Sequence, residues 1–250
     1  MIKEKIFFPN NIGRGLAGTV CRSANPSRRG VVFSHGLFST REGAKITGLA
    51  CRIAGAGYNL LTFDFSFSGE SGGNIEDLSI FQEVRDLEAA VGFFQRRGID
   101  RLHLMGSSMG GLVSLLYASE KPRGIASIIL IAAPLDVQKL LIHGAGIADP
   151  ASLPEEGKTS IDGVFIRNGF FREAMSIDAA GAAGKITAPV LVFHGARDAV
   201  VPVADAYRMM ELLAGDRKLI VIADGDHQLT RPSDIDRLGD ELLFHLASLQ

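Results

Sequence analysis

Apolar residues along the chain fall into short unbroken runs, separated by longer stretches in which apolar residues recur every three or four positions. An unbroken run predicts a strand buried on both faces, and helical spacing predicts an amphipathic helix. The runs are GVVFSHG, YNLLTFDF, RLHLM, IASIILIAAPL, PVLVFHG and RKLIVIADGDH. Helical spacing covers residues 42–56, 79–97, 203–214 and 234–249. This alternation is typical of a parallel sheet with helices on both faces.

Two further strands precede these runs. Residues 2–8 and 16–22 flank the turn Pro9–Gly15 and predict a leading hairpin. With the hairpin included, the sheet has about eight strands. We therefore predict an α/β fold with a mostly parallel, doubly wound sheet.

The rhythm breaks after the sixth predicted strand. Between Pro134 and Lys185 the chain continues for about fifty residues without a clear sheet strand, with a predicted helix at 136–144 and the aromatic segment VFIRNGFFREAM. Insertions of this length are often functional lids, and apolar contacts favour a lid over a disordered linker. We expect residues 1–134 and 186–250 to form the core, and residues 135–185 to form a small, partly helical lid.

Composition narrows the classes of protein that fit. The chain has 250 residues, 46% of them hydrophobic and 22% charged, and a net charge of -2. It has no basic field for nucleic acid, no run of about 18 apolar residues for a membrane and no signal-peptide core. Cys21 and Cys51 are too few for a disulfide framework and lack metal-ligand spacing. We expect a cytoplasmic monomer or homodimer that binds no nucleic acid, membrane or metal.

One stretch carries a chemical signature. RLHLMGSSMGGLVSLLY predicts a buried strand, a tight glycine-rich turn with Ser108 at its apex, and a helix that opens at Met109. A serine hydroxyl is a weak nucleophile until a base removes its proton, and a sharp strand-to-helix turn presents the oxygen to such a base. The small residues Gly106, Gly110 and Gly111 let the strand and helix pass closely. The turn predicts a serine nucleophile.

A second G-x-S-x-G match spans Gly69–Gly73. It follows an aromatic strand but leads into the polar loop NIEDLS, so Ser71 lacks the strand–turn–helix frame. We therefore assign the nucleophile to Ser108.

Ser108 needs a histidine and a carboxylate at the carboxyl ends of the strands, where loops converge. His227, in the loop ADGDHQL after KLIVIA, is the best placed of the six histidines. His35 and His194 also end strands, but each precedes a glycine, a spacing that more often shapes a turn. Asp198 follows the preceding strand, in HGARDAVVP. The predicted order is Ser108, Asp198, His227.

Competing acids fit less well. Asp205 is expected to be a solvated residue in the first turn of a helix, and Asp224 and Asp226 lie too near His227 along the chain to orient it. The alternative for Asp198 itself is a loop acid paired with Arg197.

A negative charge that develops on a substrate carbonyl needs backbone N–H donors. The amide of Met109 follows the nucleophile at the positive end of its helix. The second donor is expected in SHGLFS, where Gly36 lets the backbone turn so that the amide of Leu37 points inward.

The motifs SHGLFS, FDFSFSGESGG, GSSMGG, HGARDAVVP and GDHQL occur in this order across nearly the whole chain. Together they resemble the α/β-hydrolase superfamily, and most closely its short-lid cinnamoyl/feruloyl-esterase-like branch, which overlaps the serine aminopeptidase-like (S33) group. The resemblance implies that Ser108, Asp198 and His227 are catalytic and that Leu37 and Met109 donate to the oxyanion. It implies no metal or organic cofactor.

The chain departs from the family pattern at two places. Ser66 and Phe67 stand where relatives often carry the Arg and Gly of Asp-x-Arg-Gly-x-Gly, and Ser107 stands where they often carry His or Leu. Neither change removes a catalytic group. Ser66 and Phe67 lie in the loop expected to border the entrance to the site, and Ser107 directly precedes the nucleophile.

The resemblance implies acyl transfer to water. We expect a carboxylesterase-like hydrolase acting on small-molecule esters with small to medium acyl groups, aromatic cinnamoyl-type groups among them. Phe38, Phe170 and Phe171 are expected to line the acyl pocket together with Leu37. The same residues on a C–C bond, a thioester or an N-terminal peptide bond remain alternatives, as does a non-catalytic binding protein.

Overall fold

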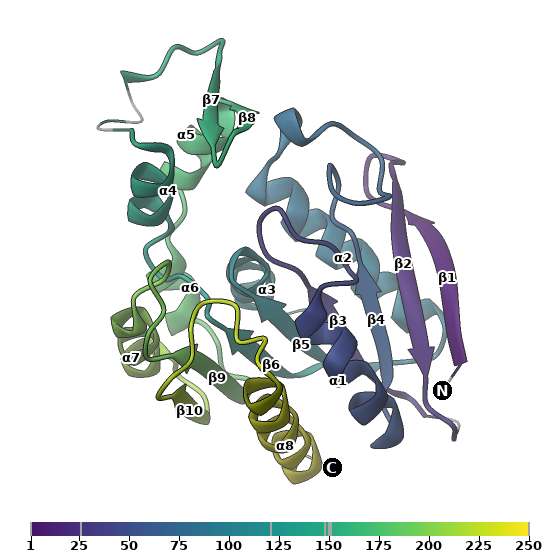
Figure 1. Cartoon of the computed structure of the whole chain (residues 1–250). Helices are drawn as coiled ribbons and strands as arrows, with labels where there is room; N and C mark the ends of the chain where they lie inside the picture. The colour runs from purple at the N-terminus through teal and green to yellow at the C-terminus, as the bar shows by residue number, and fades with distance from the viewer. Residues whose placement is uncertain (1, 26, 121, 148, 150–151, 250) are drawn as a thin grey trace.

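An eight-stranded sheet lies at the centre of the molecule (Figure 1). The computed structural model describes residues 2–25, 27–120, 122–147, 149 and 152–249. The strands, in their order across the sheet, are β1 (Ile2–Pro9), β2 (Gly15–Arg22), β4 (Asn59–Phe63), β3 (Arg29–Ser34), β5 (Arg101–Ser107), β6 (Ile125–Ile131), β9 (Val190–Gly195) and β10 (Arg217–Ile222). Among the described strand pairs of this sheet, β1–β2 and β2–β4 are antiparallel and the others are parallel. The predicted mostly parallel sheet of eight strands is confirmed.

Helices cover both faces of the sheet, as a doubly wound fold requires (Figure 1). One hydrophobic core joins the sheet to α2, α3 and α7, and a second core on the opposite face joins it to α1 and α8. These helices are α1 (Ala44–Gly55), α2 (Ile80–Arg96), α3 (Met109–Ser119), α7 (Val203–Leu212) and α8 (Pro232–Ser248), with a short 3-10 helix η1 (Ile75–Asp77) before α2. Within the described part of the chain, no helix combines the length and apolarity needed to cross a membrane.

Most of the insertion between β6 and β9, from α4 to α5, projects as a lobe at one end of the molecule (Figure 1). The elements of the insertion are α4 (Val137–Ala145), β7 (Lys158–Ile161), β8 (Val164–Arg167), α5 (Gly169–Met175) and α6 (Ala179–Gly184). Helix α4 matches the helix predicted there, and positions 148, 150 and 151 lie outside the described residues. Helix α6 packs on α3 and α7, so this last part of the insertion adds to the helix layer of the core.

The strands β7 and β8 form a two-stranded antiparallel hairpin of their own, separate from the main sheet. No strand was predicted here because each strand has four residues and β7 is largely polar. The signal was nevertheless present. Asp162 and Gly163 join the strands with φ of 50° and 82°, which is the two-residue Asp-Gly turn that favours hairpins.

A carboxylate from the insertion holds the start of α2. Ser79 caps this helix by accepting from Gln82 N, and Glu173 of α5 accepts from Ile80 N at 2.7 Å and from the Ser79 hydroxyl at 2.8 Å. The first amides of a helix have no acceptor within it, and a negative charge there is favourable. The insertion is therefore bound to the core by hydrogen bonds as well as by apolar packing.

Glycines allow the backbone to cross itself around the turn after β5. A Cβ on Gly110 would lie 2.2 Å from the carbonyl oxygen of Ser34, and one on Gly106 would lie 2.2 Å from that of Gly110. Such distances exclude any side chain. These contacts press α3 against β5 and against the loop after β3.

Replacing Gly110 with alanine should lower the free energy of unfolding by about 3 kcal/mol or more, because the added methyl group overlaps backbone atoms that cannot move independently. Gly55→Ala is the matched control. Gly55 also lies in a helix, but nothing lies within 4 Å of its added Cβ, so this change should be neutral or stabilising by up to about 1 kcal/mol. Urea unfolding followed by circular dichroism measures both, and equal stabilities would contradict the close crossing.

Candidate active site

Ser108 lies at the tip of the turn between β5 and α3, with φ 54° and ψ -120°. A non-glycine residue rarely adopts a positive φ, and such strain persists only where surrounding contacts hold it. Here Ser108 N donates to Ile131 O at 2.8 Å, while Ser108 O accepts from Gly111 N at 2.9 Å. The turn therefore projects the hydroxyl away from the end of the strand.

The structure brings Ser108, His227 and Asp198 into one chain of hydrogen bonds. His227 Nε2 lies 3.0 Å from Ser108 Oγ, and His227 Nδ1 lies 2.8 Å from Asp198 Oδ2. The three residues follow β5, β10 and β9, which are parallel and end at the same edge of the sheet. Their side chains are sheltered, since that of Asp198 is fully buried and that of His227 is 14% exposed.

Asp198 is held as a carboxylate. Its burial opposes ionisation, but contacts from His194, His227 and the Val201 amide hold the pKa of Asp198 well below its usual range. A carboxylate only accepts hydrogen bonds, so His227 Nδ1 carries the ring proton. His227 Nε2 is then free to accept the proton of Ser108, which is the arrangement that general-base activation requires.

His194, predicted only to shape a turn, contacts the same carboxylate. It is fully buried, and its Nε2 lies 3.3 Å from Asp198 Oδ2 and 2.9 Å from Val201 O. The available signal was its position four residues before Asp198. His35, by contrast, shapes its turn, with Nδ1 2.8 Å from Gly36 O and Nε2 accepting from Phe65 N.

The amides of Leu37 and Met109, the two predicted oxyanion donors, belong to segments that meet at the nucleophile turn. A Cβ on Gly36 would lie 3.3 Å from Ser107 O and from Ser108 Cβ, so the loop that carries Leu37 crosses close over the nucleophile. In the chain as described, neither Leu37 N nor Met109 N donates to a protein acceptor. Met109 N lies at the positive end of α3.

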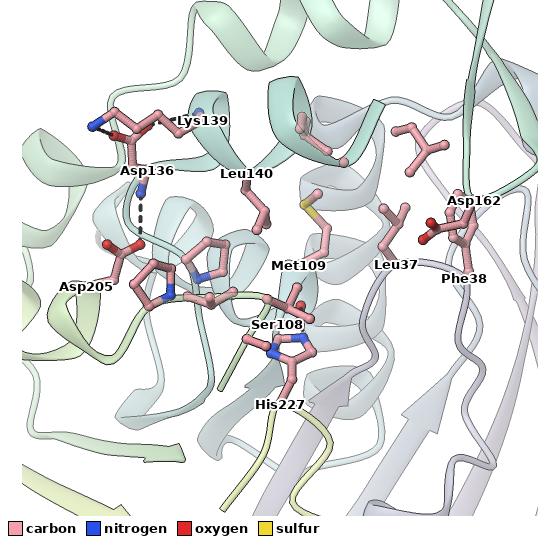
Figure 2. A pocket seen from close by; sticks show the side chains of 18 of the residues that line it. Leu37, Phe38, Ser108, Met109, Asp136, Lys139, Leu140, Asp162, Asp205 and His227 are labelled. Carbon is pink, nitrogen blue, oxygen red and sulfur yellow. Dashed lines mark hydrogen bonds and ion pairs between the residues drawn. The ribbon is translucent and has the colours of Figure 1, made fainter. Parts of the chain in front are cut away.

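A pocket of about 820 Å³ opens above Ser108 and His227 (Figure 2). Its lining is mostly apolar: Leu37, Phe38, Met109, Pro134, Leu140, Leu141, Ile161, Ala199, Val200, Val201, Pro202 and Ala204. Asp136, Lys139, Asp162 and Asp205 also line it. Phe38 is among the residues that line this pocket, as predicted.

Phe170 and Phe171 do not line this pocket, so their predicted role is wrong. They are 2% and 1% exposed, their rings meet edge to face with centroids 5.5 Å apart, and both belong to the core beneath the insertion. Helix α5 turns them inward where it packs on α2 and α4. The insertion contributes Leu140, Leu141 and Ile161 to the pocket instead.

The expectation that Asp205 is merely solvated is also wrong. Its Oδ2 accepts from Leu135 N at 2.9 Å and from Asp136 N at 3.2 Å, as Figure 2 shows for Asp136. Asp205 and Leu135 are seventy positions apart in the sequence, and their contact fixes the start of the insertion beside the pocket. Asp136 in turn pairs with Lys139 at 2.9 Å.

Ser71, the serine of the second motif, has a structural setting. Its hydroxyl donates to Asp64 O at 2.6 Å and accepts from Ala17 N at 2.9 Å. These bonds tie the loop after β4 to β2. Across the described ranges, no group of three or more His, Cys, Asp and Glu side chains is arranged to hold a metal.

Lys45, in the first turn of α1, lies beside the nucleophile turn and was not among the predicted site residues. It is 8% exposed, and its Nζ donates to Ser107 Oγ at 2.7 Å. Burial lowers the pKa of Lys45 to about 8, against the opposing effect of Asp198 and Asp226. A lysine on a helix gives no sequence signal for such a position, because only the packing of α1 directs its side chain inward.

The fold and this hydrogen-bonded serine define an α/β hydrolase. The chain belongs to the family described as serine aminopeptidase, S33, whose model matches residues 25–152, just over half of the chain. It is therefore a hydrolase of this superfamily.

Individual relatives are distant. The mitochondrial palmitoyl-protein thioesterase ABHD10 of Mus musculus is 24% identical over 217 residues, which cover 84% of this chain and 72% of the relative. Among solved structures, Est1E from Butyrivibrio proteoclasticus with ferulic acid bound is 21% identical with a TM-score of 0.88, and 98% of each chain is covered. Mouse ABHD10 is 22% identical with a TM-score of 0.81, covering 99% of this chain and 100% of that one. These structures share the fold.

Replacing Lys45 with methionine should raise the free energy of unfolding at pH 7 by about 2 kcal/mol, because it removes a buried cation. In the folded protein burial lowers the pKa of Lys45 to about 8, whereas the ordinary pKa of a lysine is 10.5. Between these values the unfolded chain binds more protons, so the wild type gains stability relative to the variant as pH rises.

Urea unfolding at pH 7 and pH 10 tests this expectation. The stability difference between Lys45→Met and wild type should shrink at the higher pH. Lys3→Met, a change on the exposed part of β1, is the control for general effects of pH. A difference that stays constant for Lys45→Met would contradict the buried cation.

Proposed function

We propose that this protein hydrolyses carboxylic esters through an acyl-enzyme formed on Ser108. The observation that carries the proposal is the chain of hydrogen bonds from Asp198 through His227 to Ser108, at the floor of a pocket of about 820 Å³. A binding protein has no need of an aligned nucleophile, base and carboxylate. The esterase and thioesterase names among its relatives support the same class of reaction.

In the proposed mechanism, Ser108 Oγ attacks the substrate carbonyl while His227 Nε2 accepts its proton. The carbonyl oxygen gains negative charge and accepts hydrogen bonds from the amides of Leu37 and Met109. One such donor typically lowers the activation free energy by about 3 kcal/mol. His227 then protonates the leaving alcohol as the C–O bond breaks. Water, activated by His227, attacks the acyl-enzyme in the same way and releases the acid.

Asp198 acts on His227 in this mechanism. Its carboxylate fixes the ring tautomer and stabilises the imidazolium that forms after proton transfer. The two backbone amides of Val200 and Val201, each 2.8 Å from Oδ1, fix the carboxylate in turn.

The acyl group is proposed to occupy the large pocket. Its apolar walls and volume suit acyl groups of small to medium size, and an aromatic acyl group of the cinnamoyl type would lie against Leu37, Met109 and Leu140. The ferulic acid bound to the similar structure Est1E supports an aromatic acyl group.

A thioester is the second candidate substrate. The observation that favours it is the 24% identity with a palmitoyl-protein thioesterase over 84% of the chain. The same acyl-enzyme mechanism cleaves a C–S bond, and the large pocket would hold part of a long alkyl chain.

Ser108→Ala and His227→Ala should each lower kcat by about a thousandfold or more on p-nitrophenyl esters, because each removes a group that acts in the transition state. Asp198→Asn should lower kcat by at least about a hundredfold while the fold is retained. The assay compares p-nitrophenyl esters from acetyl to decanoyl, methyl hydroxycinnamates, and acyl thioesters with matched acyl groups.

Covalent labelling distinguishes which of the two serine motifs carries the reactive serine. A fluorophosphonate should modify the peptide that contains Ser108 and leave the peptide that contains Ser71 unmodified, as mass spectrometry would show. Near wild-type turnover by Ser108→Ala would refute the proposal. Labelling of Ser108 without turnover of any ester would favour cleavage of a thioester, a C–C bond or an N-terminal peptide bond over ester hydrolysis.

The acyl pocket is tested by filling it. Leu140 points into the pocket in Figure 2, so Leu140→Trp should lower the ratio of kcat/KM for octanoyl over acetyl esters by about tenfold. Phe244→Trp, an exposed position on α8, is the control and should keep the wild-type ratio. An unchanged ratio in Leu140→Trp would place the acyl chain elsewhere.

A further inference from the structure

A second, smaller cavity also reaches the nucleophile. It measures about 180 Å³ and shares Leu37, Ser108 and His227 with the large pocket. An ester has two parts on either side of the reacting carbonyl, an acyl group and an alcohol. If the large apolar pocket holds the acyl group, the smaller cavity lies where the alcohol would leave.

Lys45 gives this small cavity its chemical character. Its side chain lines the cavity and is buried, yet among the described residues its hydrogen-bond partner is the neutral hydroxyl of Ser107. Throughout the described residues no carboxylate forms an ion pair with Lys45. Of the two nearby carboxylates, that of Asp198 is already bound by His227 and His194, and that of Asp226 accepts from Leu229 N. A buried ammonium with three N–H donors is costly unless an anion accompanies it.

The first turn of α1 adds to the same positive field. Gly43, Ala44, Lys45 and Ile46 line the cavity, and Gly43 at the helix start has no side chain that caps it. In the described structure, the amides of residues 44–46 donate to no protein acceptor. The positive end of this twelve-residue helix and the Lys45 ammonium therefore face one small cavity.

We propose that this cavity binds the leaving group of the substrate, and that Lys45 with the first turn of α1 recognises a carboxylate on it. The proposal rests on the proposed function. The substrate class is then an acyl ester of a small hydroxy acid. Hydrolysis breaks its acyl C–O bond, passes the Ser108 proton through His227 to the leaving oxygen, and consumes one water to give a carboxylic acid and the hydroxy acid.

The size of the cavity limits this leaving group. A volume of about 180 Å³ corresponds to about six water molecules at about 30 Å³ each. Glycolate and 3-hydroxypropionate have a comparable number of non-hydrogen atoms. An acyl group of medium length would remain on the other side of Ser108.

The experiment compares substrates that differ only in charge. The butyryl esters of glycolate and 3-hydroxypropionate are paired with those of glycolamide and 3-hydroxypropionamide, and release of butyrate is measured at neutral pH. The wild type should favour the carboxylate of at least one pair by about tenfold in kcat/KM, as expected for a charge-assisted contact. Lys45→Met should bring this ratio close to one.

Two further variants separate recognition from support of the nucleophile turn. Lys45→Gln retains a donor for Ser107 but no charge, and it should lose the preference as Lys45→Met does. Lys3→Met, the same substitution on the exposed part of β1, should keep the wild-type ratio. Equal losses on the carboxylate and carboxamide esters in the Lys45 variants would overturn the proposal, because Lys45 would then only support the turn.

The outcomes also distinguish this inference from the proposed function. If p-nitrophenyl butyrate is hydrolysed in a Ser108-dependent manner but neither pair shows a carboxylate preference, the inference fails and the esterase stands. If no ester is hydrolysed, the esterase proposal fails, and the cavity is tested by saturation-transfer NMR with 3-hydroxypropionate and Ser108→Ala protein. Binding that does not depend on Lys45 in that protein overturns the inference as well.

Discussion

Backbone contacts at the turn after β5 are the constraint on which the site depends. Gly106 and Gly110 let β5, α3 and the loop after β3 approach to distances at which no side chain fits. This packing holds Ser108 at a positive φ, a strain of about 1–3 kcal/mol that the surrounding contacts offset. The loop after β3 crosses the same turn, since a Cβ on Gly36 would lie 3.3 Å from Ser108 Cβ, so one steric arrangement positions the nucleophile and this loop.

Charges of opposite sign flank this turn. On the side of His227, the buried carboxylate of Asp198 is satisfied by two histidines and two backbone amides. On the side of Ser107, the buried ammonium of Lys45 donates to the neutral Ser107 hydroxyl and forms no ion pair within the described part of the chain. The hydrogen-bond acceptors of the Asp198 carboxylate are thus satisfied within the protein, whereas the Lys45 ammonium retains N–H donors for a ligand. For this reason we assign Asp198 to the mechanism and Lys45 to binding of the substrate.

The insertion shapes the pocket because its start and its second half are bound to the core. Asp205 accepts from the amides where the insertion begins, and Glu173 caps α2 from within it. With both points held, α4 presents Leu140 and Leu141 to the cavity above Ser108. The phenylalanines of α5 provide the apolar packing that keeps this lobe in place, which accounts for their absence from the pocket.

The sequence by itself determined the layered fold and the meeting of Ser108, Asp198 and His227, since unbroken apolar runs make parallel strands whose carboxyl ends share one edge. It also carried the Asp-Gly turn of the β7–β8 hairpin, a local signal. Only the tertiary structure decided that Asp205 anchors the insertion, that Phe170 and Phe171 turn inward and that Lys45 reaches Ser107. Those outcomes depend on how each helix is rotated and seated against distant parts of the chain, and no local pattern encodes that.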